Sequence, residues 1–330
     1  GVDIWTEADL VGLDMKDGAV AGAHLLVEGK EKTVRAAHGV IVTAGGFAHN
    51  LAMREAYQRA PVSVDWTHSN PGDQGGAIQV MRRAGAALGL MEESWWVMTF
   101  VTKDQTYQIV PELAKPHGIL VDASGQRFVN EARSYMELGR ACYERNKTSK
   151  AVPAWLVMDS NHRKRYMFAF QPPGRIPKKW LEQGAIRSDD TLEGLAKKCG
   201  IDPAGLAKTV ERFNGFVERG VDEDFQRGDN SYGAFWGDHA YAPNTNIGSI
   251  AKGPFWAAPL VPGDVGTCGG AITDEHARVL RDDGSVIDGL YAAGNCAAPF
   301  AGPHYVGAGH SIGSSSVFGY LAVQHASGRR

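Results

Sequence analysis

Two short apolar runs that each stop at glycine constrain the fold of this chain most strongly. The first lies in "VIVTAGGF" and stops at Gly45-Gly46, and the second lies in "GLYAAGN" and stops at Gly294. A continuous apolar run of this length is typical of a buried strand. Glycine after such a strand leaves bare backbone N–H groups, which suit a phosphate, a ribityl chain or a ring carbonyl. A purely structural turn is the other interpretation, and these residues alone leave both open.

The composition excludes several classes of partner. The formal net charge of -3 and a pI near 6.4 give no electrostatic basis for binding nucleic acid or an anionic membrane surface. No apolar run approaches the ~20 residues that a membrane span needs. Four cysteines are scattered without a CxxC pair or metal-like spacing, which indicates reduced thiols and predicts a cytoplasmic protein. The length of 330 residues indicates about two domains.

Local patterns divide the chain into three segments: 1–94, 95–262 and 263–330. In the first, Asp17-Gly18 predicts a hairpin turn, and Asp73 is the predicted start of a helix. In the second, "HGILVDASGQRFVNE" predicts two strands, and "TLEGLAKKCG" and "AGLAKTVERFNGFVERG" predict helices that end at glycine. In the third, Asp283-Gly284 predicts a hairpin, and small residues return before a terminal helix.

The opening of that helix is a candidate ligand site. The stretch "HYVGAGHSIGSSSVFGYLA" places one tyrosine in a glycine-rich loop ahead of Ser311–Ser316. A helix start offers unpaired N–H donors and a positive dipole end, which suit an anion or the charge on a reduced flavin ring. Alternatively, the serines compete to cap the helix.

Five motifs in a fixed order resemble one family. "TAGGFAHN", "GDQGGAI", "GQRFVNE", "GTCGGAITDEHARVL" and "GLYAAGN" are similar to segments of the flavoprotein subunits of fumarate reductases and succinate dehydrogenases. They span residues 43–295, and the loop and helix beyond extend the match to Ala322. The resemblance implies an α/β plus α+β fold, namely the later part of a Rossmann-like FAD domain (1–94 and 263–330) with an inserted mixed α+β substrate domain (95–262).

Within this family the chain resembles the 3-ketosteroid Δ1-dehydrogenases. "GPHYVGAGHSIGSSSVFGYLA" is similar to their Tyr-Pro-Gly-Pro-Gly segment and the helix after it, and "NEARSY" to their Asn-Glu-x-x-x-Tyr. A fumarate reductase would have arginine at the position of Tyr135 and another arginine at or beside the position of Tyr305. It would also have a histidine just before the position of Thr267, where this chain has Gly263–Gly266. Without those cations a site has little to hold a dicarboxylate.

The resemblance implies dehydrogenation of a 3-ketosteroid at carbons 1 and 2, with FAD as hydride acceptor. Tyr135 would be the base for the carbon-2 proton, and Tyr305 and the Gly309 N–H would polarise the carbon-3 carbonyl. An ordinary tyrosine has a pKa of ~10, so the base needs a neighbour that stabilises its phenolate. The alternative for Tyr135 is a structural phenol packed at a domain seam.

The resemblance also implies where non-covalent FAD binds. Its adenosine end would lie near Ala44, Gly45 and Gly46. Its ribityl and pyrophosphate region would meet Gly294 and Asn295. The pyrimidine edge of the flavin would face Ser311 and Ile312, to within one residue.

The strand–GxGxxG–helix unit that closes on the pyrophosphate in such proteins does not occur in this sequence. Gly1 is followed directly by strand-like residues, so we expect the later part of a longer protein or a companion chain that supplies this unit. Without it, we expect an exposed apolar face.

Two alternatives to a 3-ketosteroid dehydrogenase stay open: a related flavoprotein with another substrate, such as another ketosteroid desaturase or an enoate reductase, and a non-catalytic scaffold. Trp95, Trp96 and Phe100 are either walls of a steroid pocket or core.

Overall fold

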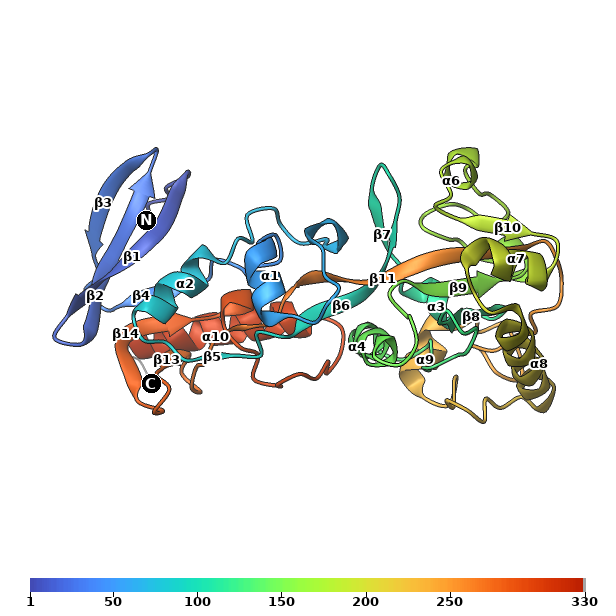
Figure 1. Cartoon of the computed structure of the whole chain (residues 1–330). Helices are drawn as coiled ribbons and strands as arrows, with labels where there is room; N and C mark the ends of the chain where they lie inside the picture. Colours follow the sequence, from blue (N-terminus) through green and yellow to red (C-terminus); the bar gives the residue numbers. More distant parts are fainter. Residues whose placement is uncertain (329–330) are drawn as a thin grey trace. The chain divides into compact units, whose positions relative to one another are not determined.

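The computed structural model describes residues 1–328, which form two compact units (Figure 1). Unit 1 contains Gly1–Trp95 and the chain from Val265 on, and unit 2 contains Trp96–Asp264. Strand β6 (Ser94–Val101) leads from unit 1 into unit 2, and β11 (Phe255–Thr267) leads back. Residues from both ends of the sequence therefore build unit 1.

An antiparallel sheet of β1 (Ala8–Lys16), β2 (Ala19–Val27) and β3 (Lys30–Arg35) begins unit 1. The turn between β1 and β2 has positive φ at Asp17 (52°) and Gly18 (83°). Two consecutive positive φ angles match the twist of a tight hairpin. The hairpin predicted from Asp17-Gly18 is confirmed.

A second sheet brings the two glycine corners together. Its order is β13 (Arg278–Leu280), β14 (Val286–Ala292) and β4 (Val40–Val42). Strands β14 and β4 are parallel, with Ala292 opposite Val42. Parallel strands end at the same edge of a sheet, so the glycines that follow β4 and β14 lie side by side. The sequence separates these strands by more than two hundred residues.

Helix α2 (Gly76–Arg83) covers this sheet through Ile78 and Met81, which are fully buried in one core cluster with Leu290. The predicted helix start at Asp73 was wrong. The N-cap is Gly75, in left-handed conformation (φ 73°) and without a side-chain cap. The other described elements of unit 1 are β5 (Leu88–Gly89), β12 (Gly270–Ala271), α1 (Leu51–Tyr57), η1 (Val64–Trp66), η2 (Gly294–Cys296) and α10 (His310–Ala326).

The sheet of unit 2 has the strand order β7-β6-β11-β9-β8, with β10 pairing with β11. Helices α7 and α8 pack against it through a shared apolar cluster, and they end at Gly200 (φ 70°) and Gly220 (φ 75°), as predicted. The described elements are β7 (Thr106–Gln108), β8 (Gly118–Val121), β9 (Ala154–Met158), β10 (Arg187–Asp189), α3 (Pro111–Ala114), α4 (Tyr135–Asn146), α5 (Ser160–Arg165), α6 (Lys178–Glu182), α7 (Leu192–Cys199), α8 (Pro203–Arg219) and α9 (Ser231–Trp236).

One predicted strand of unit 2 is missing. After β8 only a single bridge forms, between Val121 and Arg127. The Asp122 carboxylate accepts hydrogen bonds from the backbone N–H groups of Ser124 and Gln126. These bonds stabilise a turn instead of an extended ladder. The Arg127 side chain then enters a buried ion-pair network with Glu131.

His162 on α5 predicts a pH dependence of stability. Its side chain is fully buried, and burial and then the charge of Arg163 hold its pKa well below the ordinary value. The free energy of unfolding therefore keeps its full value at pH values above the unfolded pKa of ~6.5. It decreases as the pH is lowered further, because only the unfolded chain takes up the proton there. Urea unfolding should show that His162→Leu removes a slope of up to about 1.4 kcal/mol per pH unit between pH 6 and 5. His239→Leu, at an exposed position, should keep that slope, and an unchanged slope in His162→Leu would contradict the assignment.

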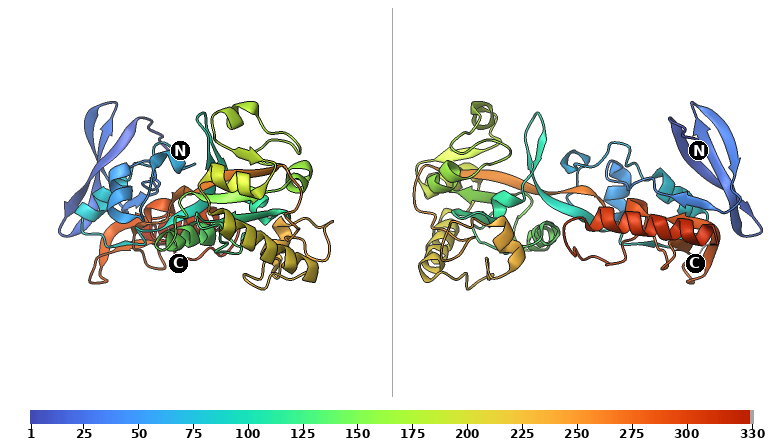
Figure 2. Two further views of the ribbon diagram at one scale, coloured as in Figure 1. Left: turned by 45° about the vertical axis from the view of Figure 1, so that its right-hand side comes forward. Right: turned by 180° about the vertical axis from the view of Figure 1, so that it is seen from behind.

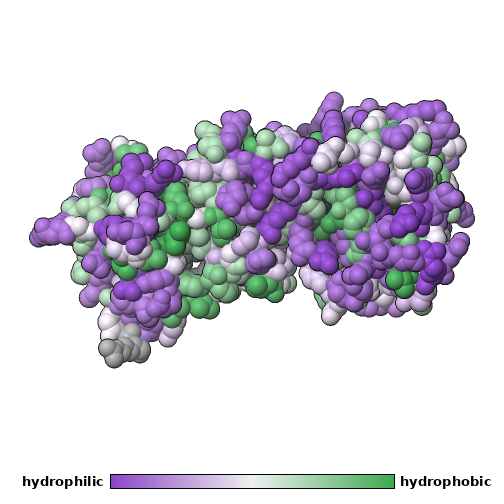
Figure 3. Space-filling model, turned by 60° about the horizontal axis from the view of Figure 1, so that its bottom comes forward, coloured by the Kyte–Doolittle hydropathy of each residue, from purple (hydrophilic) through white to green (hydrophobic). Residues whose placement is uncertain are grey.

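Helix α10 presents an apolar face. Ile312, Val317, Tyr320 and Val323 are exposed by 75%, 54%, 63% and 54%. In the right-hand view of Figure 2 no other described element lies over this helix, and Figure 3 shows hydrophobic side chains gathered on this part of the chain. Exposed apolar area of this kind marks an interaction surface. None of the helices within residues 1–328 has the length and hydropathy to cross a bilayer.

Candidate functional site

The first glycine corner is held by a contact from the end of β11. The Phe47 N–H donates to the Thr267 hydroxyl at 3.0 Å, and Thr267 is fully buried. A Cβ atom at Gly46 would lie 2.1 Å from that hydroxyl oxygen. Gly45 has a φ of 72°, which favours glycine. This corner therefore tolerates no side chain at Gly46, and its backbone comes close to whatever lies beyond β4.

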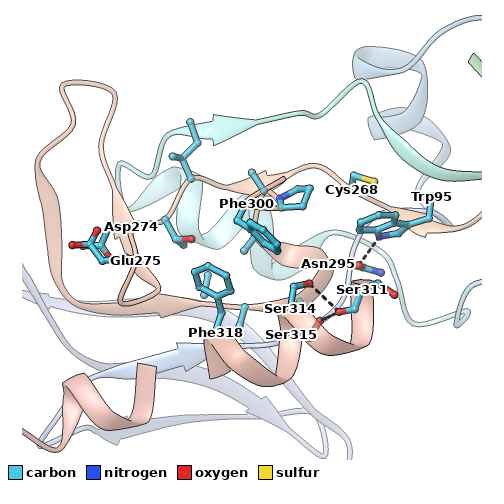
Figure 4. Close-up of a pocket in the computed structure, with 18 residues that line it drawn as sticks. Trp95, Cys268, Asp274, Glu275, Asn295, Phe300, Ser311, Ser314, Ser315 and Phe318 are labelled. Carbon is cyan, nitrogen blue, oxygen red and sulfur yellow. Dashed lines mark hydrogen bonds between the residues drawn. The ribbon is translucent and has the colours of Figure 1, made fainter. Parts of the chain in front are cut away.

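The second corner is fixed through Asn295. The Trp95 indole N–H donates to the Asn295 side-chain oxygen at 3.0 Å (Figure 4). Gly294 has a φ of 76°, and the Cys296 thiol donates to the Val42 carbonyl at 3.1 Å. Burial raises the pKa of Cys296 to about 11, so the thiol stays protonated as this donor. The sequence predicts Trp95 as either a wall of a steroid pocket or core, and no local signal indicates its bond to Asn295.

The serines at the start of α10 do not cap it, so the capping interpretation was wrong. The helix begins after Gly309, which has a φ of 84° and provides no side-chain cap. The hydroxyls of Ser314 and Ser315 donate back to the Ser311 carbonyl at 3.2 and 2.5 Å, and that of Ser316 donates to Ile312. Hydroxyls bonded to carbonyls cannot occupy the N–H groups of the first turn. The His310 N–H donates to the Gly307 carbonyl, whereas the N–H groups of Ser311 and Ile312 have no acceptor within the helix and are available to a ligand.

The two corners and the start of α10 line an open cavity of about 440 Å³. The seven residues predicted to bind FAD separate into two groups around it. Ala44 and Gly46 belong to the first corner but do not line the cavity. The five that line it are Gly45, Gly294, Asn295, Ser311 and Ile312.

The chemistry of this cavity fits the cofactor. Glycine backbone, the hydroxyls of Thr43 and Ser311 and the positive end of a 17-residue helix are donors for phosphate or ring carbonyl oxygens. The left-handed Gly294 leaves room that a side chain would fill, since a Cβ there would meet the Ser315 hydroxyl at 3.6 Å. As predicted from the family resemblance, Ser311 and Ile312 would face the flavin ring, Gly294 and Asn295 the ribityl and pyrophosphate region, and Gly45 the adenosine end of FAD.

Two further cavities adjoin the same helix start, the first of mixed polarity and the second apolar. One of about 400 Å³ shares Gly294, Asn295 and Ser311, and Phe300 and Phe318 form part of its wall together with Asp274 and Glu275 (Figure 4). Another of about 480 Å³ is lined by Phe300, Val306, Gly307, Ala308, Gly309, His310, Gly313, Ser314, Val317 and Phe318. The Phe300 and Phe318 rings stack at 6.0 Å. Space for an apolar ligand therefore lies directly beside the predicted flavin site.

The predicted catalytic residues lie in different units. Tyr305 and Gly309 belong to the loop before α10 in unit 1, and no atom lies within 4 Å of a Cβ built on Gly309. Tyr135 is the first residue of α4 in unit 2 and is partly buried. Their joint action on one ligand stays a prediction. Trp96 and Phe100 are fully buried and contact Tyr143 and Trp180 respectively, so these two aromatic residues are core.

The chain is similar to ring-ketone dehydrogenases. It is 44% identical over 334 residues to a 3-oxosteroid 1-dehydrogenase of Mycolicibacterium smegmatis, covering 98% of this chain and 59% of the relative. A 4-oxocyclohex-2-ene-1-carboxylate 5-dehydrogenase of Sinomonas cyclohexanicum is 34% identical, covering 98% of this chain and 56% of the relative. A solved structure of 3-ketosteroid Δ1-dehydrogenase from Sterolibacterium denitrificans, in complex with 1,4-androstadiene-3,17-dione, has a TM-score of 0.93 at 36% identity.

The match covers this chain almost completely but its relatives only in part. The Sterolibacterium structure matches 97% of this chain and 59% of that chain, so the chain spans less than two thirds of the length of these relatives. The sequence model described as FAD binding domain matches residues 1–312. The resemblance expected from the ordered motifs is confirmed, and so is FAD as the cofactor. The chain belongs to the FAD binding domain family.

Proposed function

We propose that the complete protein dehydrogenates a 3-ketosteroid between carbons 1 and 2. The observation that carries this proposal is the cavity of about 480 Å³ at the start of α10. Its size is within the range of small-molecule sites, and its lining, among the described residues, contains Phe300, Val306, Val317 and Phe318 but no lysine or arginine. Such a lining favours a neutral apolar ligand over a dicarboxylate.

Residues of this chain would carry out the proton transfer and the polarisation of the carbonyl. Tyr135, as phenolate, would take the proton from carbon 2 and become a phenol. The Tyr305 hydroxyl and the Gly309 N–H would donate hydrogen bonds to the carbon-3 oxygen, on which negative charge develops. Bound FAD supplies the acceptor for the hydride that leaves carbon 1, and a carbon–carbon double bond remains.

We further propose that a dinucleotide-binding segment outside these residues packs on α10 and completes a Rossmann-like FAD domain into which unit 2 is inserted. The support is the exposed apolar face of Ile312, Tyr320 and Val323, together with relatives that extend well beyond the match. That segment, within a longer chain or as a companion, would supply the pyrophosphate turn. We expect the assembled protein to act in the cytoplasm.

The test is turnover of a 3-ketosteroid by the complete protein with an artificial electron acceptor. We expect a product with a new double bond between carbons 1 and 2, and a yellow flavin spectrum. A yellow protein that oxidises only a smaller ring ketone, or reduces an enoate, would identify another substrate. A colourless protein would support the non-catalytic scaffold and contradict the proposal.

Tyr305→Phe should separate binding from catalysis. Removing one donor to a developing oxyanion typically lowers kcat by about 10²–10³-fold, and we expect that loss with the flavin spectrum unchanged. Steady-state kinetics with a 3-ketosteroid measure it. Tyr57→Phe removes a phenol on α1 of the same unit that contacts Arg82, and it should keep the wild-type rate. A Tyr305→Phe variant with unchanged kcat would exclude the phenol as a polarising group.

A further inference from the structure

His310, the first residue of α10, is a buried polar side chain that lacks a hydrogen-bond partner. It is 7% exposed, and neither ring nitrogen has a partner among the described residues. Its backbone is satisfied, because its N–H donates to the Gly307 carbonyl at 3.2 Å. Buried donors in native proteins are nearly always paired, so an unpaired imidazole at a cavity indicates a missing partner.

Two aromatic side chains hold the His310 ring in place. Trp95 lies edge-on at 5.2 Å between ring centroids with an interplanar angle of 80°, and Phe300 lies at 5.4 Å with an angle of 75°. The residue also lines the apolar cavity of about 480 Å³. The ring is therefore fixed before any ligand arrives, which reduces the entropy lost on binding.

The surroundings determine which chemical group fits His310. Burial lowers its pKa below the ordinary value, so the ring is neutral near pH 7 and offers one N–H donor. The adjacent first turn of α10 adds the backbone N–H groups and the hydroxyl of Ser311, which are also uncharged. A cluster of neutral donors with an apolar wall fits an uncharged acceptor, namely a carbonyl oxygen.

We propose that His310 is a ligand-binding residue whose imidazole N–H donates a hydrogen bond to a carbonyl oxygen of the molecule bound at the start of α10. That oxygen belongs either to the substrate ketone or to the flavin ring. The inference deepens the proposed function and rests on it for the substrate. The flavin alternative depends only on membership of the FAD binding domain family.

The test compares His310→Phe with His304→Phe in the complete protein. His304 is exposed in the same loop and serves as the matched control. Phenylalanine keeps an aromatic ring between Trp95 and Phe300 but removes the donor. Because the ligand oxygen then stays unpaired in an apolar site, we expect binding about 5- to 100-fold weaker. The apo form of His310→Phe should unfold at the same or a higher temperature, since it no longer buries an unpaired polar ring.

Two measurements identify the oxygen. A raised Kd for FAD, followed by flavin fluorescence in the apo protein, assigns the bond to the flavin. A raised KM for a 3-ketosteroid with unchanged FAD affinity assigns it to the substrate. His310→Asn, which restores an N–H donor, should recover part of either loss. Unchanged FAD affinity and unchanged KM in His310→Phe would overturn the proposal for His310. A wild-type protein without steroid turnover would instead reject the proposed function, and the FAD affinity of His310→Phe would then decide whether His310 binds the flavin.

Discussion

Replacing Tyr135 with phenylalanine should lower turnover of a 3-ketosteroid by about 10²–10⁴-fold, the usual contribution of a general base. Tyr135 is the first residue of α4 and is partly buried. The positive end of a helix favours negative charge in its first turn, so a phenolate at this position is better stabilised than one at a helix centre. Phenylalanine keeps the ring but cannot accept the carbon-2 proton.

The measurement is kcat with an artificial electron acceptor, together with the flavin absorbance. The fold of α4 should survive, because the helix is held elsewhere: a Cβ at Gly139 would lie 2.5 Å from the Trp96 side chain, and Trp96 contacts Tyr143 at 5.3 Å. Tyr143→Phe on the same helix is the matched control and should retain the wild-type rate. Full activity of Tyr135→Phe would mean that another group takes the proton.

The sequence predicted turns and helix ends at glycine correctly, whereas the helix start at Asp73 was wrong. Asp17-Gly18, Gly200 and Gly220 form the expected turn and helix ends, because glycine adopts the required positive φ without steric cost. The pairing of β4 with β14 joins distant segments, and spacing alone gives no means to find it. The ordered family motifs predicted that both corners serve one cofactor.

What local patterns missed depends on contacts between distant residues. Nothing near Trp95 indicates that its indole would bind Asn295. The serines of α10 have the composition of an N-cap, yet their hydroxyls bind carbonyls inside the helix because the chain enters it through the left-handed Gly309. The unpaired ring of His310 likewise becomes visible only once Phe300 and Trp95 surround it.

Truncating Glu131 to alanine should destabilise unit 2 by about 3–5 kcal/mol, the usual cost of removing one partner of a buried ion pair. Glu131 is buried and accepts hydrogen bonds from the Leu120 N–H and from the guanidinium groups of Arg127 and Arg227. Arg127 also pairs with the buried Asp222 at 2.8 Å. Without Glu131, the fully buried Arg227 would lose its closest negative charge.

Urea unfolding measures this loss, and Glu137→Gln is the control, since the exposed Arg133–Glu137 pair should contribute less than about 1 kcal/mol. Burial alone would raise the pKa of Glu131, but the charges of Arg127 and Arg227 hold it below the ordinary value. Its contribution is therefore complete above the unfolded pKa near 4.3 and is lost as the pH falls through the lower folded pKa. Wild type should lose more stability than Glu131→Ala between pH 5 and 3, and parallel pH profiles would show that the network carries no net stabilisation from this charge.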